Sequence, residues 1–551
     1  MSSVKISPES HCPAMPGRCL QIVRLLFVLG IGFGVCSVWT RYFIFTDGAF
    51  YATLGRNLAE GIGLRYCGAP YLFYPPGYPL AIAVLYLGLG DAELSAHLVS
   101  LFSYLASILI TARLAWRIRS SAPSVLIATT IVVFHPSFLR FSSDILSESL
   151  FVCIVLASSL CCWDLSERKT SPGWKWALWG GLGGYAYLIR ADGILYWPLQ
   201  WLYIFFRRRE NRRRWIWKSA LSLAVLFAVI TPYLLFIKHV TGTWQLSTKT
   251  AILLQYARVK TADGNLAAET KFTSKPAEDG QTFEIDRAEE TLGSFLLHHP
   301  REAMQRVVMN SLHLLRQKGI TFGWTAVLLF FWFLATRGKT GLHHKTAFIL
   351  MHLSPILFFL FFYIDSRFLL AFIPFIGIGI ARVGEDLFVM ARTLGEEGRT
   401  YTIASVILLF VAMGGIVYGP RAVRLLEKRE RTGQALPLEH KWMGNWMRTH
   451  LTILPTTKIM HRNPWVSFYA GGCHTRTPDV ADLRQLVEWC VYHDVKYLII
   501  DERMMKPNYP SLAFLLDESK NHNGLRRVKT GVGIYPKIVL YALEPSFRDD
   551  Q

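Results

Sequence analysis

The chain has 551 residues, of which 52% are hydrophobic and only 18% are charged. Such a high hydrophobic fraction excludes a disordered protein. Soluble domains carry about 25% charged residues, so the low charged fraction favours a protein whose apolar residues lie in lipid. The formal net charge of +20 would suggest nucleic-acid binding in a soluble protein. Here the basic residues gather in short loops between apolar runs, as the positive-inside rule predicts. We therefore expect the lipid bilayer, and no nucleic acid, as a partner.

The apolar runs predict a multi-pass membrane protein with a cytoplasmic N-terminus. The first run, 25–40, is followed by no small-residue cleavage site and is interpreted as an uncleaved span. Several later runs are shorter than the roughly 20 residues that a crossing helix needs, so their ends must extend into the flanking sequence. Further spans are predicted at about 94–116, 122–134, 145–163, 174–189, 193–206, 216–237, 320–334, 346–364, 368–380 and 401–417. The short run at 79–90 is interpreted as a further half-span or a re-entrant piece. We therefore expect about 11 to 13 spans in total.

Counting the spans predicts which segments lie on each side of the membrane. Eleven spans that start inside place the C-terminus outside. The inside loops are basic, 207–215 most clearly, except the last, 382–400, which is mixed in sign. Residues 1–417 are then the membrane core, with outer loops at 46–78 and 239–319. Residues 418–551 are predicted to form a small extracytoplasmic α/β domain, because a helix pattern at 483–492 precedes strand patterns at 495–500 and 538–541.

Three negative observations bear on compartment and cofactors. The sequence contains no Asn-x-Ser/Thr sequon, which favours a bacterial inner membrane. The nine cysteines show no metal-binding spacing, and the histidine pairs at 298–299 and 343–344 lack the i,i+4 spacing of a helical metal site. No metal site is therefore predicted. Cys473 and Cys490 would be able to pair if the tail lies in an oxidising compartment, and the sequence leaves their pairing open.

The first outer loop begins with an acidic residue, Asp47, before a predicted surface helix at 49–60 that Gly61 and Gly63 would end. Aspartate is a favoured N-cap residue, so capping of this helix is one interpretation. A carboxylate at the boundary of water and lipid is equally suited to act as a general base toward an acceptor hydroxyl. Local sequence does not choose between the two.

More charged residues stand at the outer ends of predicted spans. Asp144 and Glu148 are four residues apart and would share a helix face, and acidic groups at membrane depth are functional by default although they can also be solvated. Arg140, Arg190 and Arg367 end spans on the same side. Snorkelling is their simplest interpretation, but guanidinium also binds phosphate in a bidentate manner.

Carboxylates and arginines beside lipid suit the transfer of a group from a lipid phosphate donor. The leaving phosphate needs cationic partners and the acceptor needs a base. No nucleotide is expected outside the cell, so a lipid-linked donor would supply the group.

The sequence resembles polytopic GT-C glycosyltransferases of the dolichyl-phosphate-mannose protein mannosyltransferase and lipid A aminoarabinose transferase type. The resemblance covers about residues 20 to 382. The matching motifs, in order, are Asp47 with Tyr51, Arg56-Asn57-Leu58 with Glu60-Gly61, Tyr74-Pro75-Pro76-Gly77-Tyr78-Pro79, Ser147-Glu148, Arg190 with Gly193, and Arg367-Phe368-Leu369 before Pro374.

The resemblance implies an inverting transfer of a hexosyl or pentosyl group from a polyprenyl-phosphate sugar to a glycan, glycolipid or protein acceptor. In the family pattern Asp47 is the base, and Asp144 and Glu148 help to position donor or acceptor. Arg140, Arg190 and Arg367 are expected to contact the phosphate on grounds of charge and depth. The motif residues Tyr51, Arg56, Tyr74 and Tyr78 are expected to contact substrate.

Two features keep alternatives in view. Some relatives carry a basic residue beside the prolines of the first loop, where this chain has Tyr74. Metal dependence varies among GT-C enzymes, so a divalent metal cofactor stays open.

Two other classes of function are considered. A transporter or a flippase for lipid-linked sugars would also have many spans, and a membrane scaffold is a third class. No inverted repeat is visible, however, and the charges gather at one face rather than at the midplane.

Overall fold

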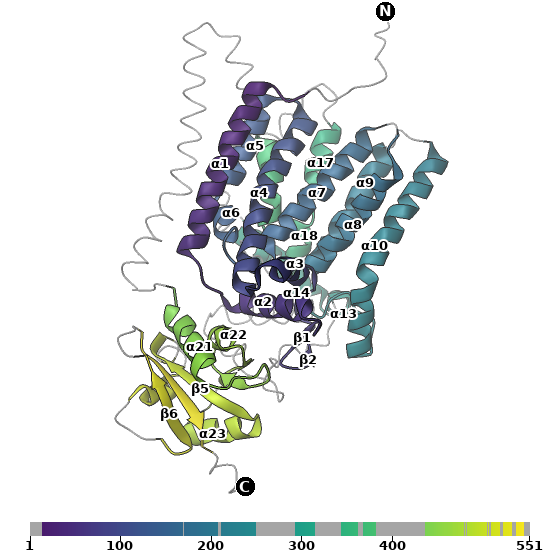
Figure 1. Ribbon diagram of the computed structural model, residues 1–551. Helices are drawn as coiled ribbons and strands as arrows, with labels where there is room; N and C mark the ends of the chain where they lie inside the picture. Colours follow the sequence, from purple (N-terminus) through teal and green to yellow (C-terminus); the bar gives the residue numbers. More distant parts are fainter. Residues whose placement is uncertain are drawn as a thin grey trace, which may run out of the picture.

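The computed structural model describes residues 14–168, 170–207, 211–249, 292–314, 343–361, 367–381, 436–478, 480, 482–503, 505, 509–517, 522–531 and 536–544. The predicted spans at 320–334 and 401–417, and the predicted domain boundary at 417–418, lie outside these residues. The described chain forms a helical bundle and, at one end of it, a region built on a β-sheet (Figure 1). We refer to residues 436–544 as the sheet region.

The bundle consists of long and short helices in chain order. They are α1 (Gly17–Thr40), α2 (Thr46–Ala59), α3 (Gly77–Leu89), α4 (Ala92–Arg119), α5 (Ala122–Phe134), α6 (Pro136–Phe141), α7 (Glu148–Glu167), α8 (Gly173–Ile189), η1 (Ala191–Leu195), α9 (Tyr196–Arg207), α10 (Arg212–Thr241), α13 (Leu292–His298), α14 (Pro300–His313), α17 (His343–Leu353), α18 (Ile356–Phe359) and η4 (Leu370–Phe372), which opens an apolar helix to Ala381. A two-stranded hairpin, β1 (Arg65–Tyr66) and β2 (Ala69–Pro70), follows α2.

Four of the described helices, α1, α4, α7 and α10, are long and apolar enough to cross a membrane. Helices α4 and α7 pack inside the bundle, whereas α1 and α10 lie at its sides (Figure 1). The outward faces of these two side helices expose large apolar residues such as Leu25, Val28 and Phe227. Such a surface is stable in lipid and not in water, so the prediction of a polytopic membrane protein agrees with the packing.

Several predicted boundaries agree with the structure and others do not. The span predicted at 122–134 has the bounds of α5. The run at 346–364 is not one helix, because α17 ends at Leu353 and α18 starts after Pro355. The span predicted from residue 145 begins later, at Glu148, and residues 144–147 form a turn in which the Leu146 N–H donates to the Asp144 carbonyl at 2.9 Å. Asp144 and Glu148 therefore do not share a helix face, and that prediction was wrong.

The sheet region is a mixed sheet with helices on both faces. Its elements are α21 (Leu438–His450), β3 (Lys458–Met460), α22 (Trp465–Ala470), β4 (Cys473–Thr475), α23 (Leu483–Tyr492), β5 (Val495–Asp501), η5 (Pro510–Leu516), β6 (Leu525–Thr530) and β7 (Ile538–Leu543). The strand order is β4-β3-β5-β7-β6, with β3 parallel to both its neighbours and β7 antiparallel to both of its own. The predicted helix at 483–492 and the two predicted strands are confirmed.

A disulfide joins the sheet region to the β1–β2 hairpin. Cys67 lies at the hairpin's two-residue turn and pairs with Cys473 of β4, with 5.2 Å between the Cα atoms. Cys67 and Gly68 both have positive φ, as the tight hairpin turn requires. A Cys473–Cys490 pair is thereby excluded, and the Cys490 thiol lies on the buried face of α23 with its Sγ 3.7 Å from the Met460 Sδ.

Candidate functional site

Asp47 lies in the first turn of α2, at the end of the bundle that faces the sheet region. The N-cap of α2 is Phe45, whose side chain makes no capping bond, so Asp47 does not cap this helix. A carboxylate in the first turn is still favoured by the helix dipole. The helix ends as predicted, with Gly61 and Gly63 at positive φ.

Arg367 pairs with Asp47 and connects it to Glu148 and Arg190 from other parts of the bundle. Arg367, just before η4, places its Nη1 3.2 Å from the Asp47 Oδ2 and its Nε 4.0 Å from the Glu148 Oε1. Glu148 is the first residue of α7, and its Oε1 also accepts a bond from the Arg190 Nη1 at 3.2 Å. We call Asp47, Glu148, Arg190 and Arg367, with the two residues added below, the central cluster. Sequence positions 47, 148, 190 and 367 thus converge in one site.

Two glycines allow the backbone to place Arg190 there. Arg190 follows the last residue of α8, and a Cβ on Gly77 at the start of α3 would lie 2.6 Å from the backbone of Leu188 and Ile189. A Cβ on Gly193 would overlap the Ala186 carbonyl oxygen. Only glycine permits both approaches. The Gly77 and Gly193 of the matched motifs therefore bring the first loop and η1 against Arg190.

Two aromatic rings and the Asp192 carboxylate hold Arg190 in place. Its guanidinium lies between the rings of Phe151 and Phe368, 5.2 and 5.1 Å from their centroids. Its Nε donates to the Asp192 Oδ1 at 3.1 Å, which adds Asp192 to the central cluster. Stacking of this kind fixes a guanidinium plane while leaving its outer N–H groups directed along the plane.

Tyrosines of the first loop line the cluster beside Asp47. Tyr51 is one helical turn after Asp47; its ring centroid is 4.4 Å from that of Tyr74, and its hydroxyl is 3.4 Å from the Ser147 Oγ. Burial raises the pKa of Tyr74, and the adjacent Asp47 carboxylate raises it further. Tyr51 and Tyr74 thus stay neutral and can donate hydrogen bonds near physiological pH.

Lys249, which sequence reasoning did not single out, completes the central cluster. It follows α10 and holds its ammonium 4.7 and 4.8 Å from the ring centroids of Phe73 and Tyr74. Among the residues that the structure describes, no carboxylate lies within ion-pair distance of it. Burial lowers its pKa to about 8; Asp47 opposes this shift, while Arg367 and Arg190 add to it. Its position in the chain, inside a predicted outer loop, gave no signal of its role.

The central cluster is balanced in formal charge and has spare bonding capacity. Its three cations (Arg190, Lys249 and Arg367) match its three carboxylates (Asp47, Glu148 and Asp192). The buried Glu148 Oε2 makes no hydrogen bond within the described chain. Native proteins seldom leave a buried carboxylate oxygen unbonded, so this atom marks a place for a ligand group.

A second set of charges, which we call the anchor cluster, lies elsewhere at this end of the bundle. The two oxygens of the buried Asp144 carboxylate bind Arg41 at 2.8 Å and Arg140 at 3.0 Å. Its backbone carbonyl accepts from the Ser100 Oγ at 2.9 Å, and a nitrogen of His97 lies 2.6 Å from the neighbouring Ser143 carbonyl. These contacts tie the end of α1 and the short α6 to α4.

Two more residues predicted to contact substrate, Tyr78 and Arg56, make their polar contacts outside the central cluster. Tyr78 is fully buried, and its hydroxyl is bound to α4 through the Ser100 Oγ at 2.8 Å and the Ala96 carbonyl at 3.2 Å. Arg56 lies in the last turn of α2, about 13 Å along the helix from Asp47. Its charge acts on Tyr66 and Tyr86. The structure brings together Asp47, Tyr51, Tyr74, Glu148, Arg190 and Arg367, and the Tyr78 ring packs on that of Tyr51 with 5.0 Å between the centroids. Arg56, Arg140 and Asp144 make their contacts elsewhere.

The sheet region contacts the residues next to Asp47. The Thr46 hydroxyl donates to the Asn463 Oδ1 at 3.2 Å, and the Tyr469 hydroxyl accepts the Ile44 N–H at 3.1 Å. The Tyr469 hydroxyl also donates to Glu93 at 2.7 Å. Lys441 of α21 binds the other oxygen of this carboxylate at 2.8 Å. Together with the disulfide, these bonds hold the sheet region against the end of the bundle that carries the central cluster.

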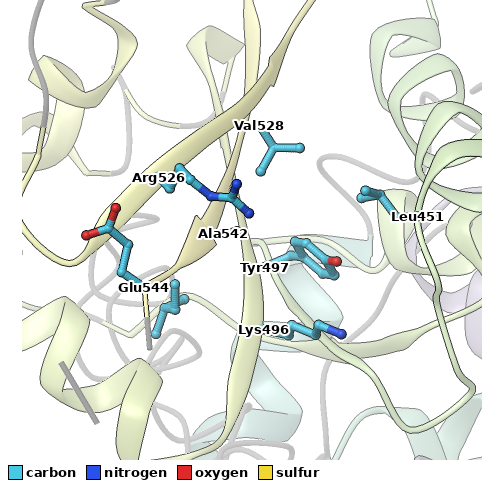
Figure 2. A pocket seen from close by; sticks show the side chains of 8 residues that line it. Leu451, Lys496, Tyr497, Arg526, Val528, Ala542 and Glu544 are labelled. Carbon is cyan, nitrogen blue, oxygen red and sulfur yellow. The ribbon is translucent and has the colours of Figure 1, made fainter. Parts of the chain in front are cut away.

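A separate hollow of about 680 Å³ lies within the sheet region (Figure 2). It opens beside β5, β6 and β7 and is lined by Leu451, Lys496, Tyr497, Arg526, Val528, Ala542, Leu543 and Glu544. No residue that the sequence analysis assigned to a site lines it.

Comparison with known proteins was made at the level of sequence and of fold. No family model and no curated protein matches the sequence. ArnT from Cupriavidus metallidurans bound to undecaprenyl phosphate is 14% identical with a TM-score of 0.55, and the match covers 96% of this chain and 99% of that one. The archaeal oligosaccharyltransferase AglB from Archaeoglobus fulgidus was solved in complex with an inhibitory peptide and a dolichol-phosphate. It is 12% identical with a TM-score of 0.54, and the match covers 90% of this chain and 71% of that one. Both are GT-C enzymes. The chain has the GT-C fold.

The fold expected from the motifs is therefore confirmed in its main features. A helical membrane bundle is joined to a small C-terminal sheet region, and the likeness to ArnT extends over nearly the whole of both chains. The number of spans and the side of the membrane on which each end lies stay predictions.

Proposed function

We propose that this protein is an inverting glycosyltransferase that moves a sugar from a polyprenyl-phosphate donor to a glycan, glycolipid or protein acceptor at the extracytoplasmic face of the membrane. The observation that carries the proposal is the central cluster, in which three cations and a carboxylate from distant parts of the chain meet beside buried tyrosines. ArnT and AglB were solved with undecaprenyl phosphate and dolichol-phosphate, respectively, and their shared fold supports a donor of this class.

The cations are suited to hold the donor phosphate. Arg190 is fixed by Phe151, Phe368 and Asp192, so its guanidinium is arranged before any ligand arrives. Lys249 lies above aromatic rings with no carboxylate at ion-pair distance among the described residues, and it can turn its charge to a phosphate oxygen. Lys249 also supplies the basic residue that some relatives carry beside the prolines, where this chain has Tyr74.

Donor binding would free the base. Arg367 is paired with Asp47 in this structure at 3.2 Å. The donor phosphate, an ester to both polyprenol and sugar, carries one negative charge and binds guanidinium through two oxygens, so it competes with Asp47 for Arg367. Asp47 then faces the acceptor without its counter-ion. Glu148 positions both arginines, and its unbonded Oε2 can accept a hydroxyl of the sugar or the acceptor.

The transfer balances in atoms and charge. The acceptor oxygen forms a bond to the anomeric carbon of the sugar while the bond from that carbon to the phosphate oxygen breaks. The acceptor's proton passes to Asp47, and the polyprenyl phosphate leaves with the bonding electrons. Arg190, Lys249 and Arg367 stabilise the negative charge that grows on the leaving phosphate.

The Cys67–Cys473 disulfide supports placement of this end outside the cytoplasm. Disulfides persist in oxidising compartments and are rare in the bacterial cytosol. On this proposal the outer loop 46–78 and residues 418–551 are extracytoplasmic, in a bacterial inner-membrane protein with a cytoplasmic N-terminus. Alkylation with and without reductant, followed by a gel-shift assay, checks the pair; free Cys67 and Cys473 thiols in intact cells would contradict the placement.

The direct test of the function compares envelope glycans and lipid-linked sugars by mass spectrometry. Cells that lack the protein would be complemented with the native chain, with Asp47→Asn, or with Asp164→Asn as a matched control. Asp164 lies about 24 Å along α7 from Glu148 and pairs with Arg117 at 3.5 Å. We expect one product to lose a sugar, and the native chain and the control, but not Asp47→Asn, to restore it. An unchanged glycan profile in cells lacking the protein, with native expression verified in the parent strain, would favour transport instead.

A further inference from the structure

Three potential metal-ligating side chains meet inside the sheet region, away from the central cluster. His440 comes from α21, His461 directly follows β3, and Asp501 ends β5. All three side chains are at most 1% exposed. Their Nε2 or carboxylate oxygen atoms lie within 4.8 Å of one another. Since β3 and β5 are adjacent parallel strands, their carboxyl ends bring His461 and Asp501 together.

Each histidine has an oxygen acceptor beside its Nδ1 atom, and that of His461 is within hydrogen-bond geometry. The Nδ1 of His440 faces the Glu439 Oε1 at 3.3 Å, and Glu439 is itself held by the Arg503 Nε at 2.9 Å. The Nδ1 of His461 lies 2.9 Å from the backbone carbonyl of Asn463. A ligating imidazole usually donates its second N–H to a carboxylate or a backbone carbonyl, which turns the other nitrogen to the ion.

His461 and Asp501 are hydrogen-bonded to each other, but His440 does not complete the network within the described residues. The His440 Nε2 is 3.5 Å from the Asp501 Oδ2, and neither nitrogen of His440 meets hydrogen-bond geometry within the described residues. Two ligands of a tetrahedral zinc ion are roughly 3.3 Å apart. The His461 Nε2, now 2.5 Å from the same oxygen, would need to move back by about 0.8 Å.

We propose that His440, His461 and Asp501 bind one divalent transition-metal ion, with zinc as the best match. Two imidazole nitrogens are borderline donors, and together with one carboxylate they suit Zn²⁺ and not Mg²⁺ or Ca²⁺, which prefer an all-oxygen set. The second oxygen of Asp501 or an enclosed water would provide the fourth donor. The site binds α21, β3 and β5 together and has a structural role.

The metal would also rigidify the segment that touches the bundle. Asn463, two residues after His461, binds Thr46 beside Asp47, and Trp465 packs on both His440 and Phe43. The ion therefore fixes the part of the sheet region that contacts the start of α2. This role does not depend on the proposed transferase activity.

The test measures metal content in the full-length protein, purified in detergent with a histidine-free affinity tag and without chelator. Elemental analysis is expected to give close to one zinc per chain for the native protein. Asp501→Asn and His461→Gln should each lower that content at least tenfold. The control is His450→Gln, which changes an exposed histidine on the same helix as His440 and should retain the metal.

A second measurement keeps the proposal testable if the variants do not fold. Native protein that has been stripped with chelator should gain several degrees in melting temperature when Zn²⁺ alone is restored, because a ligand that binds only the folded state stabilises it. Less than 0.1 zinc per chain together with no shift on adding Zn²⁺ would overturn the proposal. So would full metal content in a folded Asp501→Asn variant.

Discussion

The bundle carries two clusters of carboxylates and arginines at the same end, and they differ in how completely their groups are bonded. In the anchor cluster both oxygens of Asp144 are taken by Arg41 and Arg140. In the central cluster Glu148 has an unbonded buried oxygen, and the ammonium of Lys249 lies over rings with no carboxylate within ion-pair distance in the described chain. The two clusters contain the same residue types but are prepared for different roles.

The comparison shows that polar groups left without hydrogen-bond partners, more than residue composition, distinguish a binding site from a cluster that only stabilises the fold. A fully paired buried carboxylate connects elements and contributes to stability. A cluster that leaves charges and acceptors unpaired carries a cost that is offset when a ligand binds. The central cluster is also lined by Tyr51 and Tyr74, whereas the anchor cluster is surrounded by the serine and histidine contacts that hold α4.

The largest expected effect is on the base. Asp47→Asn removes the proton acceptor and should lower transfer by about 100- to 10,000-fold, the usual contribution of a general base. The measurement is the initial rate of sugar transfer from a polyprenyl-phosphate donor, with protein folding checked by size-exclusion chromatography. A folded variant with native rates would remove Asp47 from the mechanism.

The second effect is a loss of donor affinity, which should differ between the arginines of the two clusters. Arg367→Ala should weaken donor binding roughly 10- to 100-fold, because a hydrogen bond to a charged group is lost. Arg140→Ala is the matched change in the anchor cluster, and with its side chain 58% exposed we expect donor affinity to stay within about twofold. Titration with polyprenyl phosphate measures both. Equal losses in the two variants would erase the distinction between the clusters.

The third effect is on stability. Asp144→Asn breaks two ion pairs of a carboxylate that is 4% exposed, and it should lower the free energy of unfolding by about 2 kcal/mol. The cost is moderate because Arg41 and Arg140 are accessible enough to turn to water. A thermal melt measures the loss, and the rate per folded molecule should match that of the native protein. A tenfold slower folded variant would place Asp144 in the site after all.

The smallest effect is a pH dependence. The pKa of Lys249 is lowered to about 8, so the ammonium is present below that pH and is lost as the pH rises through it. The KM for donor should therefore increase above about pH 8, by at most about tenfold per pH unit, and Lys249→Arg should give a flat profile to higher pH. A native profile that is flat from pH 7 to 9.5 would exclude Lys249 as a phosphate ligand.

The sequence predicted the features that depend on local pattern. Apolar runs located the helices, as at α5, an amphipathic helix pattern located α23, and a β-rich run located β5. The close approach of Gly77 to Leu188 was not predicted. The predictions of these helices and strands succeed because residues buried in lipid or in a sheet face are apolar at regular positions along the sequence.

The features that failed depend on contacts between distant residues. Cys473 pairs with Cys67 across 406 residues rather than with Cys490, because β4 lies against the hairpin while Cys490 packs its thiol on Met460 from the buried face of α23. Asp144 and Glu148 separate because a turn precedes α7. Lys249 reaches the central cluster only through the path that the chain takes after α10. Spacing along the chain contains none of this information.

The most direct test of the central claim measures Asp47→Asn and Asp144→Asn side by side in one transfer assay, with rates divided by the amount of folded protein. The two substitutions make the same chemical change at the same end of the bundle. We predict that Asp47→Asn loses nearly all transfer while folded Asp144→Asn keeps the native rate and loses only thermal stability. Native transfer by Asp47→Asn, or loss of transfer in folded Asp144→Asn, would contradict the assignment of the active site to the central cluster.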